Sequence, residues 1–550
     1  MPATFAECIA ARRDHTGGGL RFEGARWTWA EVVAEADRRR GLLRTMPRQP
    51  KEHDTGQLHL GLLLENTPEF VFWLFAAALE GAVVVGLNTT RRGAELAADI
   101  THADCDLVLV EQRTAPLLEG LSLPVPVHDA ADLQLIDDRP ITGFPAAVGP
   151  ETLLLLLFSS GSTGRPKAVA CSQGRLATLA RTLSERVELH PGSVTYLCAP
   201  LFHGNALMLN LAPALWKGAT VVLARRFSAT AFTEAIAEHG ITFVNYVGRI
   251  LAYVLARPAL PGDADSTLEL AYGTEASAAD VSRFGERYGC RVQEGYGLSE
   301  GVVRINRVPG TPADALGQPV CPYPVQVRNS DTGLECPPAE RDEHGRVTNP
   351  DQAIGEIVAV GGAAAFEGYY RNPGASVERI RGDDFWTGDL AYRDEDGWFY
   401  FAGRANDWLR IDGENLAAGP IERILERHPA VAVAAVYSVP DPRTGDQLMC
   451  TLQADCFEPQ EFADFLSAQG DLGAKSVPRF IRVTDRMPTT GSNKTSKSPL
   501  RRSAWRTRDR VWWRPGRELS FAPFGPAERA EWEREFDEHG RSGLLPESGK

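Results

Sequence analysis

The chain has 550 residues, 43% hydrophobic and 24% charged, and a globular chain of this length requires at least two domains. Its 58 Lys and Arg residues against 72 Asp and Glu residues give a net charge of −14, which argues against a nucleic-acid partner and leaves room for a local basic pocket. The nine cysteines are scattered without a CxxC pair, which argues against a metal centre or a disulfide framework and favours a reducing, cytoplasmic compartment.

The N-terminal stretch MPATFAECIAARRD has no basic segment followed by an apolar core, so we predict no signal peptide. No apolar run approaches the roughly 18 residues that a membrane helix needs. We therefore predict no transmembrane segment, and any membrane contact would be peripheral.

The first 150 residues alternate between helical and strand patterns. A helix is predicted over Thr28–Leu43, with Thr28 as its N-cap, and a second over Thr67–Leu79. Strands are predicted over Leu58–Leu64, Ala82–Leu87 and Leu107–Val110. This alternation is typical of an α/β fold with a largely parallel sheet.

A polar loop follows the apolar run Leu153–Phe158, which reads as a buried strand. The loop, Ser159–Lys167, combines glycines, hydroxyl side chains and two cations, the composition of a phosphate-binding turn. It is not a Walker A loop, because Pro166 has no N–H and pushes Arg165 toward an extended conformation. We expect the loop to lie between two strands, the second over Ala168–Cys171; a surface turn that binds nothing is the alternative.

Residues 310–365 are rich in Pro and Gly and carry strand signals such as Gly355–Val360, which predicts a small β subdomain.

Further distinctive segments follow the helix predicted over Gln173–Val187. The segments are Tyr196–Met208 (YLCAPLFHGNALM), Phe243–Leu255 (FVNYVGRILAYVL), Leu268–Ser277 (LELAYGTEAS), Cys290–Glu300 (CRVQEGYGLSE), Trp386–Asp389 (WTGD), Gly397–Arg404 (GWFYFAGR), Trp408–Leu425 (WLRIDGENLAAGPIERIL) and Pro488–Lys497 (PTTGSNKTSK).

In this order the segments resemble those of the adenylate-forming superfamily, which includes acyl-CoA synthetases, luciferases and peptide-synthetase adenylation domains. The resemblance extends from about Leu58 to Leu500, and the DGEN and GTEAS wording is most similar to the fatty acyl-CoA and very-long-chain acyl-CoA synthetase branch. It implies a large N-terminal α/β domain with parallel-rich sheets, residues 1–403, and a small mobile α+β domain, residues 404–550. The hinge is expected at 404–407, and a tail after about 500 exceeds the usual end of a synthetase.

The resemblance implies a site for ATP with Mg²⁺. Tyr296 offers a flat face to a purine, Asp389 can accept hydrogen bonds from both ribose hydroxyls, and Glu300 offers the hard oxygen that Mg²⁺ prefers. A solvated surface charge is the alternative for Glu300. The implied nucleotide-binding residues are Ser159, Ser160, Gly161, Ser162, Thr163, Gly164, Lys167, Thr274, Glu275, Tyr296, Gly297, Asp389 and Arg404; the implied catalytic residues are Lys494, Glu300, His203 and Thr163.

The resemblance also implies a pocket for the acid substrate, with His203 near the acyl carboxylate. A hydrogen-bonded structural histidine is the alternative. Arg249 and Arg304 would favour a second anionic group on the substrate if they face the pocket, and they are ordinary surface arginines if they point to solvent. The implied lining is His203, Tyr246, Arg249, Tyr272, Gly297 and Arg304.

In the second domain the family uses a loop lysine to stabilise the acyl carboxylate and the α-phosphate. Lys494 matches this lysine best. Asn493 replaces the usual Gly of the loop, so Lys497 is kept as the second candidate; a solvated basic loop is the alternative. At the hinge, Asn406 stands where the family favours Asp or Lys, and the region of Gly413 is the one that turns toward the site for the thioester step. The tail carries RTRDRVWWRPGR and a helix predicted over Ala527–His539, and a solvated basic face is expected there, with a docking segment as the alternative.

The implied reaction is adenylation of a carboxylic acid followed by transfer to CoA. The altered asparagines at the hinge and in the lysine loop, together with the two arginines, keep open an aryl-acid ligase or an ATP-dependent diazotase that activates nitrite for an aryl amine. A non-catalytic acyl- or nucleotide-binding protein is a third hypothesis, which intact acidic and basic motif residues oppose. The expected partners are a small-molecule acid and CoA or another acceptor; the sequence does not give the oligomeric state.

Overall fold

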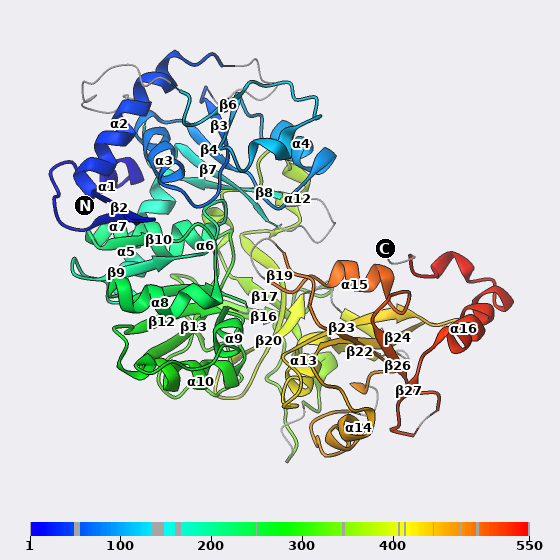
Figure 1. The fold of residues 1–550 in the computed structure, drawn as a ribbon. Helices are drawn as coiled ribbons and strands as arrows, with labels where there is room; N and C mark the ends of the chain where they lie inside the picture. Colours follow the sequence, from blue (N-terminus) through cyan, green and yellow to red (C-terminus); the bar gives the residue numbers. More distant parts are fainter. Residues whose placement is uncertain are drawn as a thin grey trace. The chain divides into compact units, whose positions relative to one another are not determined.

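The computed structural model divides the chain into two compact units (Figure 1). Unit 1 comprises Met1–Val302 and Ala364–Ile380, and unit 2 comprises Val303–Ala363 and Arg381–Lys550. The structure describes residues 2–48, 56–133, 148–159, 167–248, 250–343, 347–404, 408–411, 414–443, 445–473, 476–490, 494–516 and 518–547.

The first sheet of unit 1 has the order β6-β5-β3-β4-β7-β8. All neighbouring pairs are parallel except β7 with β8. Alternate side chains face helices on opposite sides, with α3 over one face and α4 over the other. The bounds are β3 His59–Leu63, β4 Val83–Gly86, β5 Leu107–Val110, β6 Val127–Asp129, β7 Leu153–Ser159, β8 Lys167–Ser172, α3 Pro68–Glu80 and α4 Gly93–His102.

The second sheet of unit 1 runs β13-β12-β11-β9-β10-β1-β2, and every pair is parallel except β1 with β2. Helices α5 and α7 share one apolar core with both sheets, and α8, α9 and α10 cover the far face (Figure 1). The bounds are β1 Gly19–Phe22, β2 Ala25–Thr28, β9 Val194–Leu197, β10 Thr220–Leu223, β11 Phe243–Val247, β12 Leu270–Thr274, β13 Arg291–Gly297, α1 Phe5–Ala10, α2 Trp29–Thr45, α5 Gln173–Arg186, α6 Gly204–Ala206, α7 Ala212–Lys217, α8 Ala229–His239, α9 Ile250–Leu255, α10 Ala278–Tyr288 and α12 Pro373–Val377.

Local chemistry explains where these elements begin. The side chain of Thr28 accepts from the backbone of Glu31, whose carboxylate accepts in return from Thr28, so a capping box starts α2 as the sequence predicts. Helix α3 is apolar on every side and is buried throughout its middle, between its sheet and α2. The strands and helices predicted for residues 1–150 are therefore confirmed, within a residue or two at their ends.

Unit 2 contains a small β region and a mixed α+β region. In the β region, β16 Val325–Arg328, β17 Gly355–Ala359, β19 Asp384–Arg393 and β20 Phe399–Arg404 pair in antiparallel order, which confirms the predicted β subdomain. In the mixed region the sheet β22-β21-β24-β25-β26-β27, with β23 beside β24, carries apolar clusters on both faces. The remaining bounds are β14 Arg304–Asn306, β15 Gln318–Pro319, β18 Ile380–Arg381, β21 Trp408–Ile411, β22 Glu414–Ala417, β23 Val433–Pro440, β24 Asp446–Gln453, β25 Phe480–Thr484, β26 Arg510–Trp513, β27 Ala522–Pro523, α11 Pro350–Ala353, α13 Ala418–Leu425, α14 Pro459–Ser467, α15 Lys497–Ser503 and α16 Pro526–Glu538.

The tail after Leu500 differs in part from the expectation. It adds β26 and β27 to the sheet, and α16 packs Trp532 and Phe536 into a buried aromatic cluster with Phe480 and Trp505. The expectation of a solvated basic face holds for Arg508 and Arg510, which are exposed, while Val511 is buried and Trp512 and Trp513 are half-buried in the sheet. The predicted helix of the tail is confirmed as α16.

The predicted boundary at residues 403 and 404 stays a prediction, because hinge residues 405–407, including Asn406, lie outside the described residues. Gly413 also lies outside them. Within the described ranges, no helix combines the length and the apolar character needed to cross a bilayer.

Candidate functional site

The carboxyl ends of the two parallel sheets of unit 1 meet around Asn66, which follows β3. Its amide donates to the carbonyl oxygens of Ala199 and Ala224, which follow β9 and β10, at 2.9 and 3.0 Å. Its side-chain oxygen accepts from the backbone N–H of Leu201 at 2.8 Å. Loops that leave parallel strands at their carboxyl ends are where α/β folds bind ligands, so this junction is the candidate site.

The loop that carries His203 crosses this junction. A Cβ atom at Gly86, the last residue of β4, would lie 2.8 Å from the carbonyl oxygen of Phe202, so this close approach requires glycine. His203 precedes α6, and its ring lies 4.9 Å from that of Phe202. The structure thus places His203 where the carboxyl ends of the strands of both sheets meet.

The candidate phosphate loop connects β7 to β8, as predicted. Ser159 pairs with Lys167 in an antiparallel register, so the two ends of the loop lie side by side. The predicted loop residues Ser160, Gly161, Ser162, Thr163 and Gly164 lie outside the described residues, as does the side chain of Ser159.

Of the two cations of this loop, Lys167 is the one that lies within the described residues, and its side chain is only 6% exposed. Its ammonium lies 4.9 Å from the centre of the Tyr369 ring and 3.8 Å from the carboxylate of Glu378. Burial lowers the pKa of Lys167, the nearby Arg379 lowers it further, and Glu378 and Glu300 partly oppose the shift. The ammonium thus lies between an aromatic face and acidic groups, which offset the cost of burying its charge.

Glu300 is buried, and among the described residues the hydroxyl of Tyr369 is its hydrogen-bond donor, at 2.5 Å from Oε1. Burial raises the pKa of Tyr369 and the charge of Glu300 adds to the effect, so the hydroxyl keeps its proton and donates. In the described part of the chain, no group of three or more His, Cys, Asp or Glu side chains could hold a metal ion. Glu300 instead fits the way Mg²⁺ binds, with one protein carboxylate, phosphates and water.

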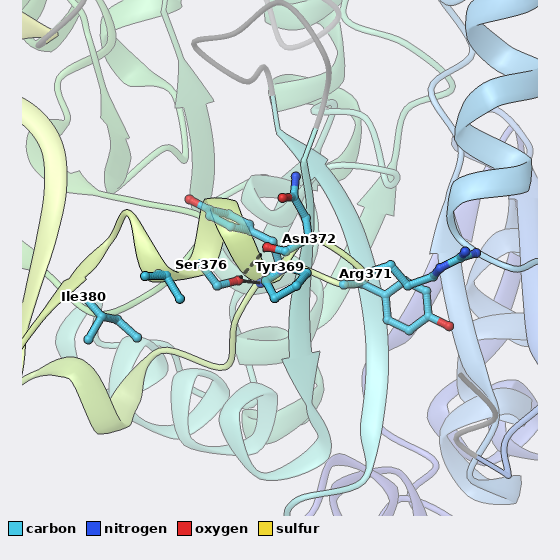
Figure 2. A pocket seen from close by; sticks show the side chains of 8 residues that line it. Tyr369, Arg371, Asn372, Ser376 and Ile380 are labelled. Carbon is cyan, nitrogen blue, oxygen red and sulfur yellow. Dashed lines mark hydrogen bonds between the residues drawn. The ribbon is translucent and has the colours of Figure 1, made fainter. Parts of the chain in front are cut away.

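The segment that supplies Tyr369 is fastened to β8. The N–H of Ala170 donates to the carbonyl oxygen of Gly368 at 3.2 Å, and the N–H of Tyr370 donates to that of Ala168 at 2.8 Å. A pocket of about 590 Å³ lies beside this segment and is lined by residues from Tyr369 to Ile380. Figure 2 shows Ser376 hydrogen-bonded to Tyr369 at the pocket, while the side chain of Arg371 points away from Ser376.

Arg175, which sequence analysis missed, holds the turn that carries Glu300. Its guanidinium donates to the carbonyl oxygens of Ser299 and, at 2.8 Å, Ala170. Gly301 has a φ of +72°, and a Cβ atom there would lie 2.5 Å from Arg175 Nη2. Glu367 lies 3.7 Å from Arg175 and accepts from Ser172 at the start of α5. The turn is therefore fixed on both sides of Glu300.

The predicted adenine segments end β12 and β13, which are parallel neighbours. Glu275 has a φ of +70°, a strained conformation that marks a constrained turn after Thr274. Tyr296 is buried and Gly297 is exposed at the end of β13. These four residues thus lie at the same sheet edge as the His203 loop.

The two predicted pocket tyrosines are core residues in unit 1. Tyr246 is fully buried, and its hydroxyl donates to Glu294 at 3.2 Å. Tyr272, 7% exposed, belongs to a separate apolar cluster with Leu183 and Phe243. Their predicted contact with substrate stays a prediction, and Arg249 lies outside the described residues.

A row of buried amides backs the His203 loop. Asn245 donates to Asn205 at 2.6 Å, Asn210 donates to Asn245 at 2.7 Å, and Thr195 donates to Asn210 at 2.7 Å. Asn210 belongs to a π-helical turn, Leu207–Leu211, a feature that recurs at functional sites. Polar residues in an apolar stretch are the signal that could have revealed this row.

In unit 2, Asp389 and Arg404 are directly opposite each other on β19 and β20. The Asp389 carboxylate is 10% exposed and lies 3.7 Å from Arg404 Nε. Glu356 holds the strand just before Asp389 by accepting from the N–H of Gly388 at 2.5 Å. Arg304 lies in β14, with its N–H 2.9 Å from the sulfur of Cys321, and its predicted role is untested.

The candidate lysine loop is a short hairpin of unit 2. Thr490 and Lys494 exchange backbone and hydroxyl hydrogen bonds across it, and Asn493 lies outside the described residues. Lys497 instead forms an ion pair with Glu422 of α13 at 2.8 Å. This pairing gives Lys497 a structural partner, and the assignment of Lys494 as the functional lysine stays a prediction.

Comparison with known protein families shows the family to which the chain belongs. The AMP-binding enzyme family matches residues 8–370, and the AMP-binding enzyme C-terminal domain matches residues 420–494. The chain belongs to the AMP-binding enzyme family. This confirms the expected adenylate-forming superfamily, and the relatives described next confirm its acyl-CoA synthetase branch and the expected ligase class.

Two members of the family match almost the whole chain. The steroid-22-oyl-CoA synthetase of Rhodococcus jostii is 47% identical, over 98% of this chain and 99% of that protein. The medium/long-chain-fatty-acid–CoA ligase FadD17 of Mycobacterium tuberculosis is 40% identical, over 92% of this chain and 98% of that protein.

Solved structures of CoA ligases share the fold. A benzoate CoA ligase from Burkholderia xenovorans LB400 superposes with a TM-score of 0.78 at 23% identity, covering 90% of this chain and 99% of that one. The predicted fold class, a large α/β part with a smaller α+β part, is confirmed.

Proposed function

We propose that this protein is an AMP-forming acyl-CoA synthetase for a large apolar carboxylic acid, of the steroid side-chain class or the medium- to long-chain fatty class. The observation that carries the proposal is the 47% identity to a steroid-22-oyl-CoA synthetase over nearly the full length of both chains. The 40% identity to a medium/long-chain-fatty-acid ligase supports the wider class.

In the proposed first step, a carboxylate oxygen of the acid attacks the α-phosphorus of ATP. The bond to the bridging oxygen breaks, and pyrophosphate leaves. The residues of unit 1 bind and orient the nucleotide: Lys167 meets phosphate, Tyr296 stacks on adenine, and Thr274 with Glu275 borders it. Thr163 and its loop neighbours would supply further hydroxyl and N–H donors.

Residues of unit 2 would complete nucleotide binding and charge stabilisation. Asp389 is suited to the ribose hydroxyls, because its buried carboxylate has acceptor oxygens only. Arg404 would add donors to ribose or phosphate oxygens. Lys494 would stabilise negative charge on the reacting carboxylate and α-phosphate, which accounts for a lysine on a hairpin.

We assign Glu300 as the residue that holds Mg²⁺, which when bound neutralises phosphate charge and orients the pyrophosphate leaving group. In the second step, the thiol of CoA loses its proton to solvent, its sulfur attacks the acyl carbon, and AMP leaves with the electron pair of the broken bond. His203 is suited to border the acyl carboxylate, because its loop crosses the sheet junction. A cytoplasmic location and peripheral membrane contact stay predictions.

Pyrophosphate release from MgATP tests the proposal with a panel of acids. The panel holds a steroid with a C-22 carboxylate, fatty acids of medium and long chain, an aryl acid, and nitrite with an aminoaryl acid, each with and without CoA. We expect release with the steroid or fatty acids and a CoA thioester as the product. Release with nitrite alone, indifferent to CoA, would contradict the proposal in favour of the diazotase, and release with the aryl acid alone would correct the substrate class.

A further inference from the structure

Tyr369 connects the two charged groups that the nucleotide site uses in unit 1. Its hydroxyl donates to Glu300 Oε1 at 2.5 Å, and the centre of its ring lies 4.9 Å from the ammonium of Lys167. All three side chains are buried, with residue exposures of 5% for Tyr369, 8% for Glu300 and 5% for Lys167. One aromatic side chain therefore contacts both the carboxylate of Glu300 and the ammonium of Lys167.

The direction of the hydrogen bonds at Tyr369 is fixed by chemistry. An ionised carboxylate only accepts, so the single hydroxyl proton goes to Glu300. The guanidinium of Arg379 only donates, and its Nε lies 3.3 Å from the same hydroxyl oxygen. A donor behind the hydroxyl polarises it and strengthens its bond to the carboxylate. The bond engages Oε1, and within the described residues Oε2 of Glu300 accepts no hydrogen bond.

We propose that Tyr369 is a positioning residue of the nucleotide site, whose hydroxyl orients Glu300 for the metal of MgATP while its ring holds Lys167 for phosphate. This inference rests on the proposed function and adds to it a residue outside the phosphate and adenine segments. The hydroxyl and the ring have separate tasks, so substitutions can separate them.

The surroundings of Tyr369 are rigid enough for this role. Its backbone pairs with Val169 of β8, and its N–H donates to the hydroxyl of Ser376 at 2.9 Å. Figure 2 shows Ser376 beside Tyr369 on the wall of the pocket. On the other side, Arg175 fixes the turn of Glu300 through the carbonyl oxygen of Ser299. A carboxylate held from both sides loses little freedom when it takes a metal ion.

The experiment compares Tyr369→Phe, Tyr369→Leu and the wild-type chain by calorimetric titration with ATP, once with excess EDTA and once across Mg²⁺ concentrations. Tyr370→Phe is the matched control. The Tyr370 hydroxyl donates to Asp104 at 2.9 Å, so this change also removes one tyrosine-to-carboxylate bond from the same segment and leaves Glu300 untouched.

For Tyr369→Phe, we expect ATP affinity in EDTA to match the wild type and the Mg²⁺ affinity of the enzyme–ATP complex to fall about tenfold or more, the usual effect of losing a group that orients a metal ligand. For Tyr369→Leu, we expect ATP affinity in EDTA to fall as well, by about threefold to tenfold, because Lys167 loses its aromatic face. Tyr370→Phe should titrate like the wild type in both series.

An Mg²⁺ affinity in Tyr369→Phe equal to that of the wild type would overturn the role of the hydroxyl, and so would an equal loss in Tyr370→Phe. Should Tyr369→Phe fail to fold, Arg379→Gln takes its place, with a smaller loss of Mg²⁺ affinity expected and an unchanged affinity as the contradicting result. The titrations contain no acid and no CoA, so a wrong acid class leaves them unaffected. A wild-type chain that binds no ATP would overturn the proposed function and this inference together.

Discussion

Lys167 in unit 1 and Lys494 in unit 2 carry the same charge in opposite settings. Lys167 begins a strand, and its side chain is 6% exposed against an aromatic ring. Lys494 lies on a hairpin that a few bonds to Thr490 close, and it is half-buried. Lys167 lies in the edge strand β8, and Lys494 lies in a short connecting segment of unit 2.

The difference suggests a division of labour between the two lysines. A cation fixed among buried partners can bind a phosphate that stays in one place through both steps. A cation on a hairpin can be supplied for the step that needs it and withdrawn afterwards, as a two-step synthesis requires. The following predictions test each side of this comparison, from the largest expected effect to the smallest.

Replacing Lys494 with alanine should have the largest effect. We expect Lys494→Ala to lower acid-dependent pyrophosphate release by about 10²–10³-fold, because a charge that stabilises the transition state is lost. ATP affinity by calorimetry should stay close to that of the wild type. Pyrophosphate release at the wild-type rate would show that Lys494 is not the lysine of this step.

Replacing Arg175 should disturb the fixed side of the comparison. Arg175→Met leaves the carbonyl oxygens of Ser299 and Ala170 without their donor. We expect the free energy of unfolding to fall by about 1–3 kcal/mol, with slower pyrophosphate release. Arg181→Met on the same helix is the control, and equal behaviour of the two variants in urea titration and pyrophosphate assays would contradict the role of Arg175.

Replacing Lys497 should sharpen the choice between the two lysines of unit 2. The ion pair of Lys497 with Glu422 is 19% exposed at each side chain. For Lys497→Gln, we expect less than about 1 kcal/mol of lost stability and pyrophosphate release close to the wild-type rate. A collapse of release comparable to that of Lys494→Ala would make Lys497 the functional residue instead.

The smallest effect concerns the pH dependence of unit 2. His428 is buried between the rings of Phe462 and Phe465, and burial lowers its pKa from the ordinary 6.5. A lowered folded-state pKa gives stability that is present above pH 6.5 and lost as pH falls through the lowered value. The urea midpoint of the wild type should therefore drop more between about pH 7.5 and 5.5 than that of His428→Phe. A parallel drop in both proteins would exclude this histidine as a source of acid sensitivity.

Local patterns predicted the elements that local chemistry determines. The cap at Thr28 and the two strands around the phosphate loop follow from residues within a few positions of one another. The order of motifs added the family and the fold. Lys167 and Glu300 were named from their motifs, while their shared partner Tyr369 was not, because a contact across 69 residues leaves no local pattern.

The tail after Leu500 shows where reading charges alone falls short. Its arginines suggested a solvated face, yet Trp532 and Phe536 are spaced for one face of a helix and pack against Phe480 and Trp505. Counting aromatic residues as well as charges could have predicted the burial. The half-buried Arg175 offered no such signal, because arginine is usually exposed.

The insertion of residues 364–380 into unit 1 has a consequence for the order of events during synthesis. Glu300 leaves the ribosome 69 residues before Tyr369. At roughly 5–20 residues per second, about 3–14 s separate the two. During this interval the nascent chain already carries the acid and the lysine of the nucleotide site without the tyrosine that joins them. The binding centre of unit 1 is thus completed late, from a segment translated after the start of unit 2, and a nascent chain halted before that segment would lack Tyr369.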